Sequence, residues 1–356
     1  MRAADATVVG GGAAGAAVAW HLASAGAAVA LVHDHRERWR PVGQQLSAAA
    51  RPVLRSLGVL DALTGAAVPV HEARSAWGGP DVDCRPAIFN PHGPPLAVDR
   101  PRLDHLLRAA ARHAGARVLD GHARAVRTSD GAWQVWDGTG RRWTTRVLVD
   151  ATGAGRALTR AHLPWTLVDR LRCVLWQARP AGAAPQPWSL VEADPDGWWY
   201  TAPTPGGDHL TVMRVEDMPA ATGRPGAPLQ PPPHTRDRLA DRLPAVCDYR
   251  VAVVGYANPP WAPNLVAAGD AALAVDPLSS SGLDNALHLA APASAAALGL
   301  IGGDPGPAHR YAQQVHALAA RHLELRHYYL SQPTEYAAFP FWTRRTPTAS
   351  PLATSR

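Results

Sequence analysis

Residues 6 to 32 read Ala6-Thr-Val-Val-Gly10-Gly-Gly12-Ala-Ala-Gly15-Ala-Ala-Val-Ala-Trp-His-Leu22-Ala-Ser-Ala-Gly26-Ala-Ala-Val-Ala-Leu-Val32, and this stretch decides the fold. An apolar strand leads into Gly-x-Gly-x-x-Gly, a helix of small residues follows, and a second apolar strand begins after Gly26. Such a βαβ unit holds a dinucleotide pyrophosphate at the helix N-terminus. We expect Gly10 to form the tight turn, Gly12 to admit the phosphates and Gly15 to let helix and strand pack closely. Ala13 and Ala14, in the first helical turn, would then lie beside the pyrophosphate.

The same stretch has a second interpretation as a signal peptide or membrane span, because residues 8–32 are nearly free of charge. Glycine and alanine dominate it, Trp20 and His21 lie in its middle, and no compact leucine-rich run precedes a cleavage-type site. These features favour the βαβ interpretation. We find no other apolar stretch long and clean enough to cross a bilayer, so the sequence predicts a cytoplasmic protein without membrane contact.

Composition narrows the class of protein. The chain has 356 residues, 47% of them hydrophobic and 18% charged, which is enough for a large core and predicts two interlocked domains. Its cysteines, Cys84, Cys173 and Cys247, are far apart and form no Cys-x-x-Cys pair, which favours a reducing compartment over a disulfide framework or zinc ribbon. The triplet His33-Asp34-His35 lacks partners at a metal-binding spacing, so we interpret it as a surface loop and expect no metal.

The net charge is +6, and the chain contains no lysine, so arginine supplies the positive charge. The arginines are dispersed and form no basic stripe interleaved with aromatic residues, which argues against nucleic-acid binding. A modestly basic surface suits an anionic cofactor or an acidic peptide partner.

The remaining sequence alternates between helical and strand patterns. Between 165 and 250 it is rich in strands with proline-rich interruptions, the strongest at 225–233, and the tail beyond Thr346 is predicted to be disordered. We expect helices within 42–63 (closed by Gly58), 100–114, 277–298 and 307–330, and strands at 118–119, 126–143, 146–153 and 265–270.

Four motifs occur in the order that flavoprotein monooxygenases use: the βαβ opening, Arg100, Asp150-Ala-Thr-Gly153 and Gly269-Asp270-Ala-Ala. The chain therefore resembles the aromatic hydroxylases. Finer motifs are similar to the tryptophan-halogenase branch, and within it to the monooxygenases that hydroxylate tryptophan in a peptide during quinone-cofactor formation. These motifs are Val42-Gly-Gln-Gln, Ser75-Ala-Trp-Gly78, Pro91-His-Gly93, Asp196-Gly-Trp-Trp-Tyr-Thr-Ala-Pro203, Asp276-Pro-Leu-Ser-Ser-Ser-Gly282, Tyr328-Tyr329 and Phe341-Trp342.

The resemblance implies an α/β fold, in which a Rossmann-type FAD-binding domain is interleaved with a β-sheet substrate domain and followed by a C-terminal helix. The expected boundaries are 1–65, 96–160 and 262–302 for the FAD-binding domain, 66–95 and 161–261 for the substrate domain, 303–345 for the helical segment and 346–356 for a flexible tail.

The resemblance also assigns residues to FAD. Asp270 would accept hydrogen bonds from the ribityl hydroxyls, and Arg100 would contact the flavin or the pyrophosphate. The flavin strap, defined here as residues 276–283, would run beside the isoalloxazine and turn its backbone N–H groups toward the carbonyl edge. Its expected contacts are Pro277, Ser281, Gly282 and Leu283, and Asp34 and Gln44 complete the set of cofactor residues.

Three departures from the family pattern bear on the reaction. Halogenases of this branch use a lysine beside the substrate and commonly a glutamate in the strap. This chain has no lysine and carries Ser279 at that position, so halogenation is disfavoured. The acidic residue that binds the adenosine ribose falls at His33, with Asp34 one place later, and Gln44 replaces a common glutamate. Thr152 precedes Gly153 where NAD(P)H-binding relatives have Asp-Gly, which favours a separate flavin reductase.

For the reaction, the resemblance implies hydroxylation of an aromatic, indole-type ring by a C4a-hydroperoxide of FAD in a biosynthetic tailoring pathway. A free metabolite, a carrier-bound residue and a peptide all remain open as substrates. Candidate site residues are an aromatic wall of Trp198, Trp199 and Tyr200, with sheet packing as the alternative, and a proton shuttle at His92. Trp77 is a weaker candidate, and the C-terminal aromatics either cap the site or pack the last helix: Tyr328, Tyr329, Phe341 and Trp342.

Two other functions stay open. A flavin oxidase or reductase would act on C–C or C–N bonds without inserting oxygen. A flavin-free relative would bind a precursor peptide, a hypothesis that His33 and Gln44 support, whereas the retained glycines and Asp270 oppose it.

Overall fold

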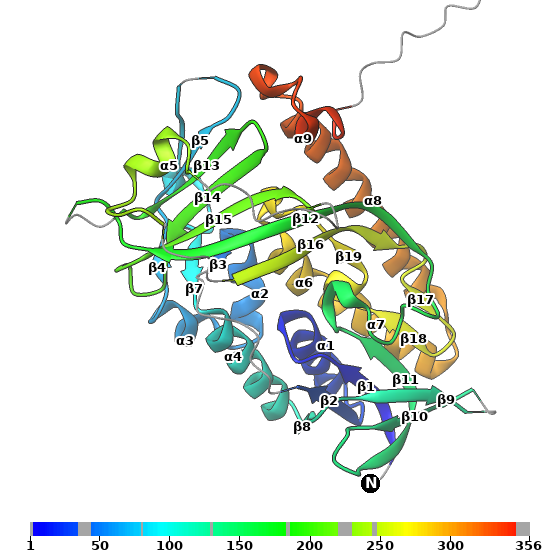
Figure 1. Cartoon of the computed structure of the whole chain (residues 1–356). Helices are drawn as coiled ribbons and strands as arrows, with labels where there is room; N and C mark the ends of the chain where they lie inside the picture. Colours follow the sequence, from blue (N-terminus) through cyan, green and yellow to red (C-terminus); the bar gives the residue numbers. More distant parts are fainter. Residues whose placement is uncertain are drawn as a thin grey trace, which may run out of the picture.

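The chain forms two eight-stranded sheets and a small third sheet, with helices packed mainly on the first (Figure 1). This arrangement confirms the expected α/β fold. The computed structural model describes residues 3–34, 44–79, 81–128, 131–182, 186–219, 230–243 and 248–346. His35, Cys247, most of the 225–233 loop and the tail beyond Thr346 lie outside these ranges.

The first sheet has the order β17-β18-β11-β1-β2-β8, and β9 and β10 extend it from β11. Its five central strands run parallel, and β2 is buried along its whole length, which explains the continuous apolar sequence there. The strands are β1 (Ala4–Val9), β2 (Val29–His33), β8 (Arg117–Asp120), β9 (Arg124–Arg127), β10 (Trp133–Trp136), β11 (Arg142–Asp150), β17 (Trp261–Ala262) and β18 (Leu265–Ala267).

The turn from β1 into α1 requires glycine at two positions. Gly10 has φ +109°, and a Cβ there would overlap the carbonyl oxygen of Ala151. A Cβ on Gly15 would in turn overlap the carbonyl oxygen of Gly10. The helix therefore starts in direct contact with the strand, as the motif predicts.

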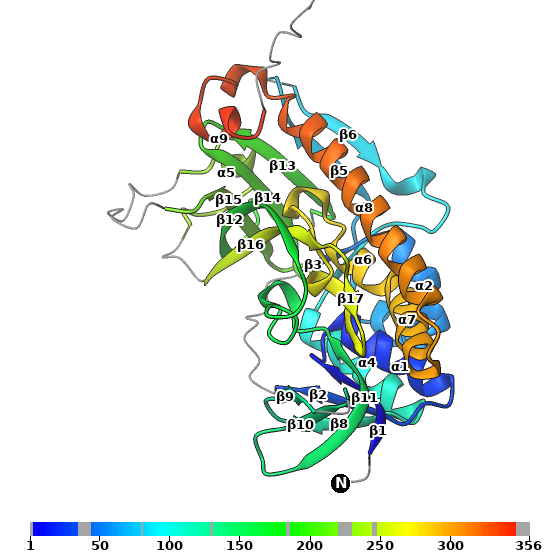
Figure 2. The ribbon, with the colours of Figure 1, turned by 90° about the vertical axis from the view of Figure 1, so that its right-hand side faces the viewer.

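Four helices pack together on the first sheet. The central one, α1 (Ala13–Ser24), contacts α4 (Arg100–His113) and α7 (Ala290–Gly302), and α7 also contacts α8 (Gly306–Leu330). Small buried alanines on α1 and α7 allow a close approach, at which the Ser294 hydroxyl donates to the carbonyl of Val18 at 3.2 Å. Figures 1 and 2 show α8 continuing from this layer to the second sheet.

One expectation about apolar segments was wrong. The run Gly282–Gly302 is long and apolar enough to cross a membrane, and 44% of its most apolar window is buried inside the protein. In the structure the run is divided between α6 (Gly282–His288) and α7, and α7 packs against α1, α8 and the first sheet. Its apolar character is therefore explained by its place in the core.

The second sheet has the order β19-β16-β12-β15-β14-β13-β5-β6 and is antiparallel except between β13 and β5. β19 lies within 262–302, which we assigned to the FAD-binding domain, yet it pairs with β16 of this sheet. The strands are β5 (Glu72–Ala76), β6 (Asp83–Pro86), β12 (Trp165–Ala178), β13 (Trp188–Asp194), β14 (Gly197–Pro203), β15 (Leu210–Asp217), β16 (Asp248–Ala257) and β19 (Leu273–Ala274).

Two hydrophobic clusters cover the two faces of the second sheet. The near cluster consists of Leu171, Cys173, Ala193, Trp198, Val215, Val254, Leu330, Phe341 and Trp342, and Leu278 of the strap packs against it. The far cluster consists of Val174, Trp176, Trp199, Leu210 and Val212. The near cluster thus joins the sheet to the strap and to the C-terminal helices.

Short elements complete the described chain. The third sheet contains β3 (Gln44–Leu46), β4 (Val68–Pro69) and β7 (Leu96–Val98). The other helices are η1 (Ala48–Ala50), α2 (Arg51–Ser56), α3 (Leu60–Thr64), η2 (Ala87–Phe89), η3 (Gly153–Gly155), α5 (Pro233–Asp237), η4 (Gly269–Ala271), η5 (Pro277–Ser279), η6 (Thr334–Tyr336) and α9 (Pro340–Thr343).

Candidate functional site

The N-terminus of α1 forms an anion-binding cradle. Gly12 is its N-cap residue and provides no side-chain hydrogen bond. The Ala13 N–H is bound by Asp104, and the N–H groups of Ala14 and Gly15 keep their capacity to bind an anion. Arg100 lies over this turn, with its Nη2 atom 3.4 Å from where a Cβ on Gly12 would stand. The helix dipole and the guanidinium therefore act on the same space.

Arg100 is held in place by two side chains. Its Nε donates to Asp104 Oδ1 at 2.9 Å and its Nη1 donates to Gln44 Oε1 at 3.0 Å. Asp104 is buried and also accepts from the Ala13 N–H; burial raises the pKa of its carboxyl, and the charge of Arg100 opposes that rise. Sequence analysis missed Asp104, although its i+4 spacing from Arg100 was visible. Gln44 reaches the site through Arg100.

Asp270 lies on η4, which packs against α1 and α6. Its neighbours Gly269 and Ala271 are buried, whereas the Asp270 side chain is exposed. The residue as a whole is exposed, but the surrounding protein desolvates its carboxyl; this desolvation raises the pKa of the carboxyl, and the charge of Arg100 opposes the rise. Arg100 thus lies close both to Gly12 and to Asp270, and a role of the three in binding FAD stays a prediction.

Beyond Asp270 the strap leads to the second sheet, where Leu278 packs against the near cluster. The Asp276 side chain accepts the Leu278 N–H at 3.0 Å and so caps η5, which begins at Pro277. Ser281 is the N-cap of α6 and makes no side-chain cap bond, and Gly282 and Leu283 open that helix. The Ser281 N–H donates to Ser279 Oγ at 3.3 Å, so the N–H groups that would reach the carbonyl edge of a flavin are those of Gly282 and Leu283.

The glycine cradle, Asp270 and the strap would hold the pyrophosphate, the ribityl chain and the isoalloxazine of FAD in that order. N–H and guanidinium groups suit the anionic part and a carboxylate suits the hydroxyl-bearing part, and the contacts themselves stay a prediction.

The adenosine end departs from the common pattern. His33 ends β2, is buried, and its Nε2 lies 2.7 Å from Asp120 Oδ1. A Cβ on Gly11 would stand 2.5 Å from the His33 Cβ, so His33 borders the glycine loop directly. The Asp34 carboxylate lies 3.7 Å from His122 Nδ1. A contact of Asp34 with the adenosine ribose stays a prediction.

The two neighbouring tryptophans separate onto opposite faces of the second sheet. Trp199 belongs to the far cluster, stacks on Trp176 with ring centroids 5.7 Å apart, and donates its Nε1 to Asp194 at 2.6 Å. These contacts favour sheet packing, the alternative for Trp199, because side chains alternate along a strand and Trp199 lies on the opposite face from Trp198. Trp198 belongs to the near cluster with Leu278, and its buried Nε1 has no hydrogen-bond partner among the described residues.

Tyr200 connects the second sheet to the third sheet. Its hydroxyl donates to Gln45 Oε1 on β3 at 2.8 Å, and burial raises the pKa of the phenol well above its usual value. A neutral phenol in this contact serves as a link between β14 and β3. Sequence analysis missed Gln45, since nothing in its sequence neighbourhood indicates Tyr200.

The other aromatic and histidine candidates lie at the edges of the site. His92 is exposed in the turn after η2, where Asn90 accepts its backbone N–H. No hydrogen bond or ion pair connects its imidazole to the described residues, so the structure gives no support to a shuttle there. Trp77 donates its Nε1 to the Tyr329 carbonyl at 2.7 Å and packs on Trp342, whose own Nε1 donates to the Asp194 carbonyl. Tyr328 and Tyr329 are exposed.

A pocket of about 400 Å³ lies between the strap and α8. The strap contributes polar residues and Leu278, and α8 contributes both apolar and charged side chains. The lining residues are Asp276, Leu278, Ser279, Ser281, Asn285, Leu318, Arg321, His322, Leu325, Arg326 and Tyr329.

Thr152 has a local structural role. Its N–H and its hydroxyl both contact Asp150 Oδ1, at 3.0 and 2.6 Å, and its hydroxyl also accepts the Ala157 N–H. This loop closure explains the threonine without reference to the electron donor, so a separate reductase stays a prediction.

Comparison with known proteins identifies the family. The sequence model of the family described as Tryptophan halogenase matches residues 87–354, which is more than half of the chain. The chain belongs to the tryptophan halogenase family.

Solved structures of similar proteins agree with this membership of the tryptophan halogenase family. The peptidyl tryptophan dihydroxylase QhpG, described as essential for tryptophylquinone cofactor biogenesis, is 26% identical with a TM-score of 0.75 over 96% of this chain and 78% of its own. The myxobacterial chondrochloren halogenase CndH is 21% identical with a TM-score of 0.76, over 99% and 87% of the two chains. The p-nitrophenol 4-monooxygenase PnpA from Pseudomonas putida DLL-E4 shares the fold at 15% identity, with a TM-score of 0.70 over 97% and 88%.

A shorter similarity exists to curated sequences. A stretch of 114 residues is 37% identical to the methylenetetrahydrofolate–tRNA-(uracil-5-)-methyltransferase TrmFO of Anaeromyxobacter dehalogenans (strain 2CP-C). The chain spans a quarter of the length of the curated relatives that it matches. The family match and the structures together confirm the predicted resemblance to this branch. The similar structures include an FAD-dependent halogenase and a monooxygenase, which share the fold of this chain.

Proposed function

We propose that the enzyme hydroxylates an indole-type ring, with reduced FAD supplied or regenerated by a separate reductase. Bound FAD in its reduced form would activate O₂ for the insertion of one oxygen atom. The protein's own residues would hold the cofactor, exclude water and orient the ring.

The observation that carries this proposal is the pocket between the strap and α8. Its volume of about 400 Å³ is within the range of small-molecule sites, and Leu278, Leu318 and Tyr329 give it apolar surface for a ring. Because the strap forms one wall, a ring bound there would lie next to the segment that borders the isoalloxazine. Leu325 lines the pocket and is exposed, so it is accessible to a larger substrate such as a peptide.

The composition of this pocket supports hydroxylation over halogenation. Ser279, which occupies the position of the halogenase glutamate, lines the pocket, and the lining contains no lysine. The dihydroxylase QhpG, at 26% identity, acts on peptidyl tryptophan, and a similar substrate class would suit this pocket.

Trp198 is the residue we assign to the sheet side of the substrate space. It lies in the near cluster with Leu278, which also lines the pocket. Its buried Nε1 could donate to a polar group of a bound substrate.

The test is a single-turnover reaction of the FAD-loaded enzyme with isotopically labelled O₂, using a chemically or enzymatically reduced flavin. Tryptophan, tryptamine and tryptophan-containing peptides would be offered with chloride present. We expect one labelled oxygen atom in the product of at least one of them. An oxidised product without label would support an oxidase, a chlorinated product would support a halogenase, and either would contradict the proposal.

A further inference from the structure

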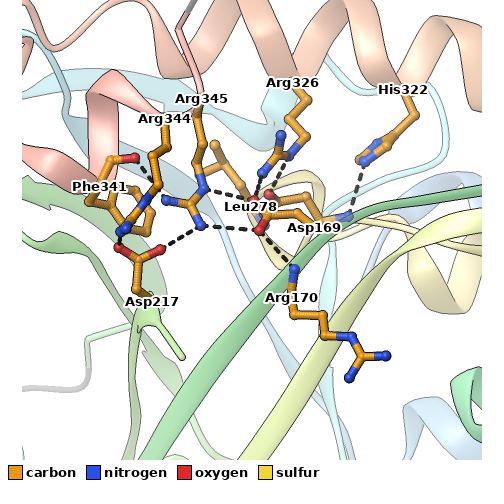
Figure 3. Close-up of polar contacts among 10 residues, drawn as sticks. Asp169, Arg170, Asp217, Leu278, His322, Arg326, Phe341, Arg344 and Arg345 are labelled. Carbon is orange, nitrogen blue, oxygen red and sulfur yellow. Dashed lines mark hydrogen bonds and ion pairs between the residues drawn. The ribbon is translucent and has the colours of Figure 1, made fainter. Parts of the chain in front are cut away.

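Two side chains of α8 form hydrogen bonds with Asp276, the first residue of the strap (Figure 3). His322 Nε2 accepts the Asp276 N–H at 3.0 Å, and Arg326 Nε donates to Asp276 Oδ2 at 2.7 Å. The other carboxylate oxygen of Asp276 caps η5 through the Leu278 N–H. Backbone and side chain of this one residue are thus fixed from α8, immediately before the segment that borders the isoalloxazine.

Arg326 does not act on the strap alone. Its Nη2 donates to Asp169 Oδ2 of β12, and Arg345 contacts the same carboxylate through Nε at 2.7 Å. Arg345 also reaches Asp217 Oδ1 of β15 at 2.8 Å. Figure 3 shows these residues as one chain of contacts from the strap across the second sheet to the C-terminal segment.

The network is protected from solvent at the strap end. The Asp276 side chain is 2% exposed and the Arg326 side chain 9% exposed. In such surroundings a charged pair is weakly screened, and its geometry is held more firmly than that of a surface pair. Asp276 can therefore move little while Arg326 is in place.

We propose that Arg326, together with His322, is a positioning residue that sets the register of the flavin strap through Asp276. A strap held in register keeps the backbone N–H groups of Gly282 and Leu283 in place for the carbonyl edge of FAD. Such donors would favour the negative charge that the reduced isoalloxazine carries. The assignment rests on the cofactor and is independent of the substrate that the enzyme uses.

The experiment compares Arg326→Gln with Arg345→Gln, which removes a guanidinium from the same network without touching the strap. FAD affinity is measured by titration, the flavin spectrum by absorbance, and the two-electron midpoint potential by dye equilibration. We expect Arg326→Gln to weaken FAD binding about fivefold or more and to lower the potential. Arg345→Gln should leave both close to the parent values. Arg326→Lys, which keeps one charged contact, should recover part of the change.

A second pair of variants avoids burying an unpaired carboxylate. His322→Gln retains an acceptor for the Asp276 N–H, whereas His322→Ala removes it. We expect the potential and FAD affinity to change in His322→Ala and to be largely retained in His322→Gln. Parent-like flavin properties in both Arg326→Gln and His322→Ala, or equal changes in Arg326→Gln and Arg345→Gln, would overturn the proposal.

Discussion

A substitution of Asp270 should change the affinity for FAD without changing the stability of the FAD-free protein. The residue is exposed, and its carboxylate has no hydrogen bond among the described contacts. In Asp270→Asn we expect FAD affinity to fall by roughly ten- to a hundredfold, because hydrogen bonds to a charged acceptor contribute about 1.5–3 kcal/mol. The thermal unfolding of the FAD-free protein should stay unchanged. Titration with FAD and a melting curve decide; a loss of stability with intact binding would refute the assignment.

Trp198 and Trp199 allow a matched comparison of two substitutions, because they are neighbours in one strand but lie on opposite faces of the sheet. Trp199→Phe leaves Asp194 without its indole donor and should destabilise the protein by about 1–3 kcal/mol. Trp198→Phe removes a donor that has no partner in the described structure, so its cost should stay below about 1.5 kcal/mol. Chemical denaturation measures both. Under the proposed function, only Trp198→Phe should raise KM for the substrate.

Residues with local partners could be predicted from the sequence, and residues with distant partners could not. The cradle glycines, Arg100 and Asp270 belong to short motifs whose chemistry is visible in the neighbouring residues. The pairing of Tyr200 with Gln45 spans 155 positions, and nothing near either residue indicates it. Trp198 and Trp199 illustrate a second limit, because the face that each occupies depends on the strand's register in the sheet.

Among the helices, α8 should make the stability of the folded protein depend on pH, because its His322 binds the strap. Burial lowers the pKa of His322 below its usual 6.5, and the ring accepts the Asp276 N–H in its neutral form. The unfolded chain therefore takes up protons first as the pH falls. The corresponding stability is present above pH 6.5 and is lost as the pH falls through the folded value.

We expect the free energy of unfolding to decline less steeply below pH 6.5 in His322→Gln than in the parent protein. Urea denaturation at a series of pH values measures the difference. The comparison with the variant cancels the contribution of His21, whose pKa burial also lowers. Identical slopes in the two proteins would show that His322 does not titrate in this way.

Most helices and strands followed from periodicity, and the exceptions have physical causes. The helix expected over 277–298 is divided into η5, α6 and α7. The chain turns between η5 and α6 at Ser280, which has φ +49°, and α6 ends at His288, with one residue between it and α7. The strand β19 has two residues and pairs only with β16, so its sequence carries no recognisable pattern.

At the scale of the whole molecule, the cysteines report on global unfolding. Cys173 lies in the near cluster, and burial raises the pKa of its thiol to about 12, whereas Cys84 is exposed on β6. In a Cys247→Ser background, a thiol reagent at neutral pH should modify Cys84 in the folded protein. Cys173 should react only with denaturant present. Mass spectrometry after a time course tests this, and rapid labelling of Cys173 in the native protein would contradict the packing described.

The order of strands in the first sheet determines when the parts of the cofactor site can form during translation. β1, β2, β8 and β11 have all left the exit tunnel long before β18, which pairs with β11 and leads into Asp270. The entire run from β12 to β16 is translated in between and enters a different sheet. A nascent chain can therefore form the glycine cradle early but acquires the carboxylate and the strap only near the end of synthesis. Loading of the flavin should consequently be a late event, and chains truncated before residue 269 should emerge colourless.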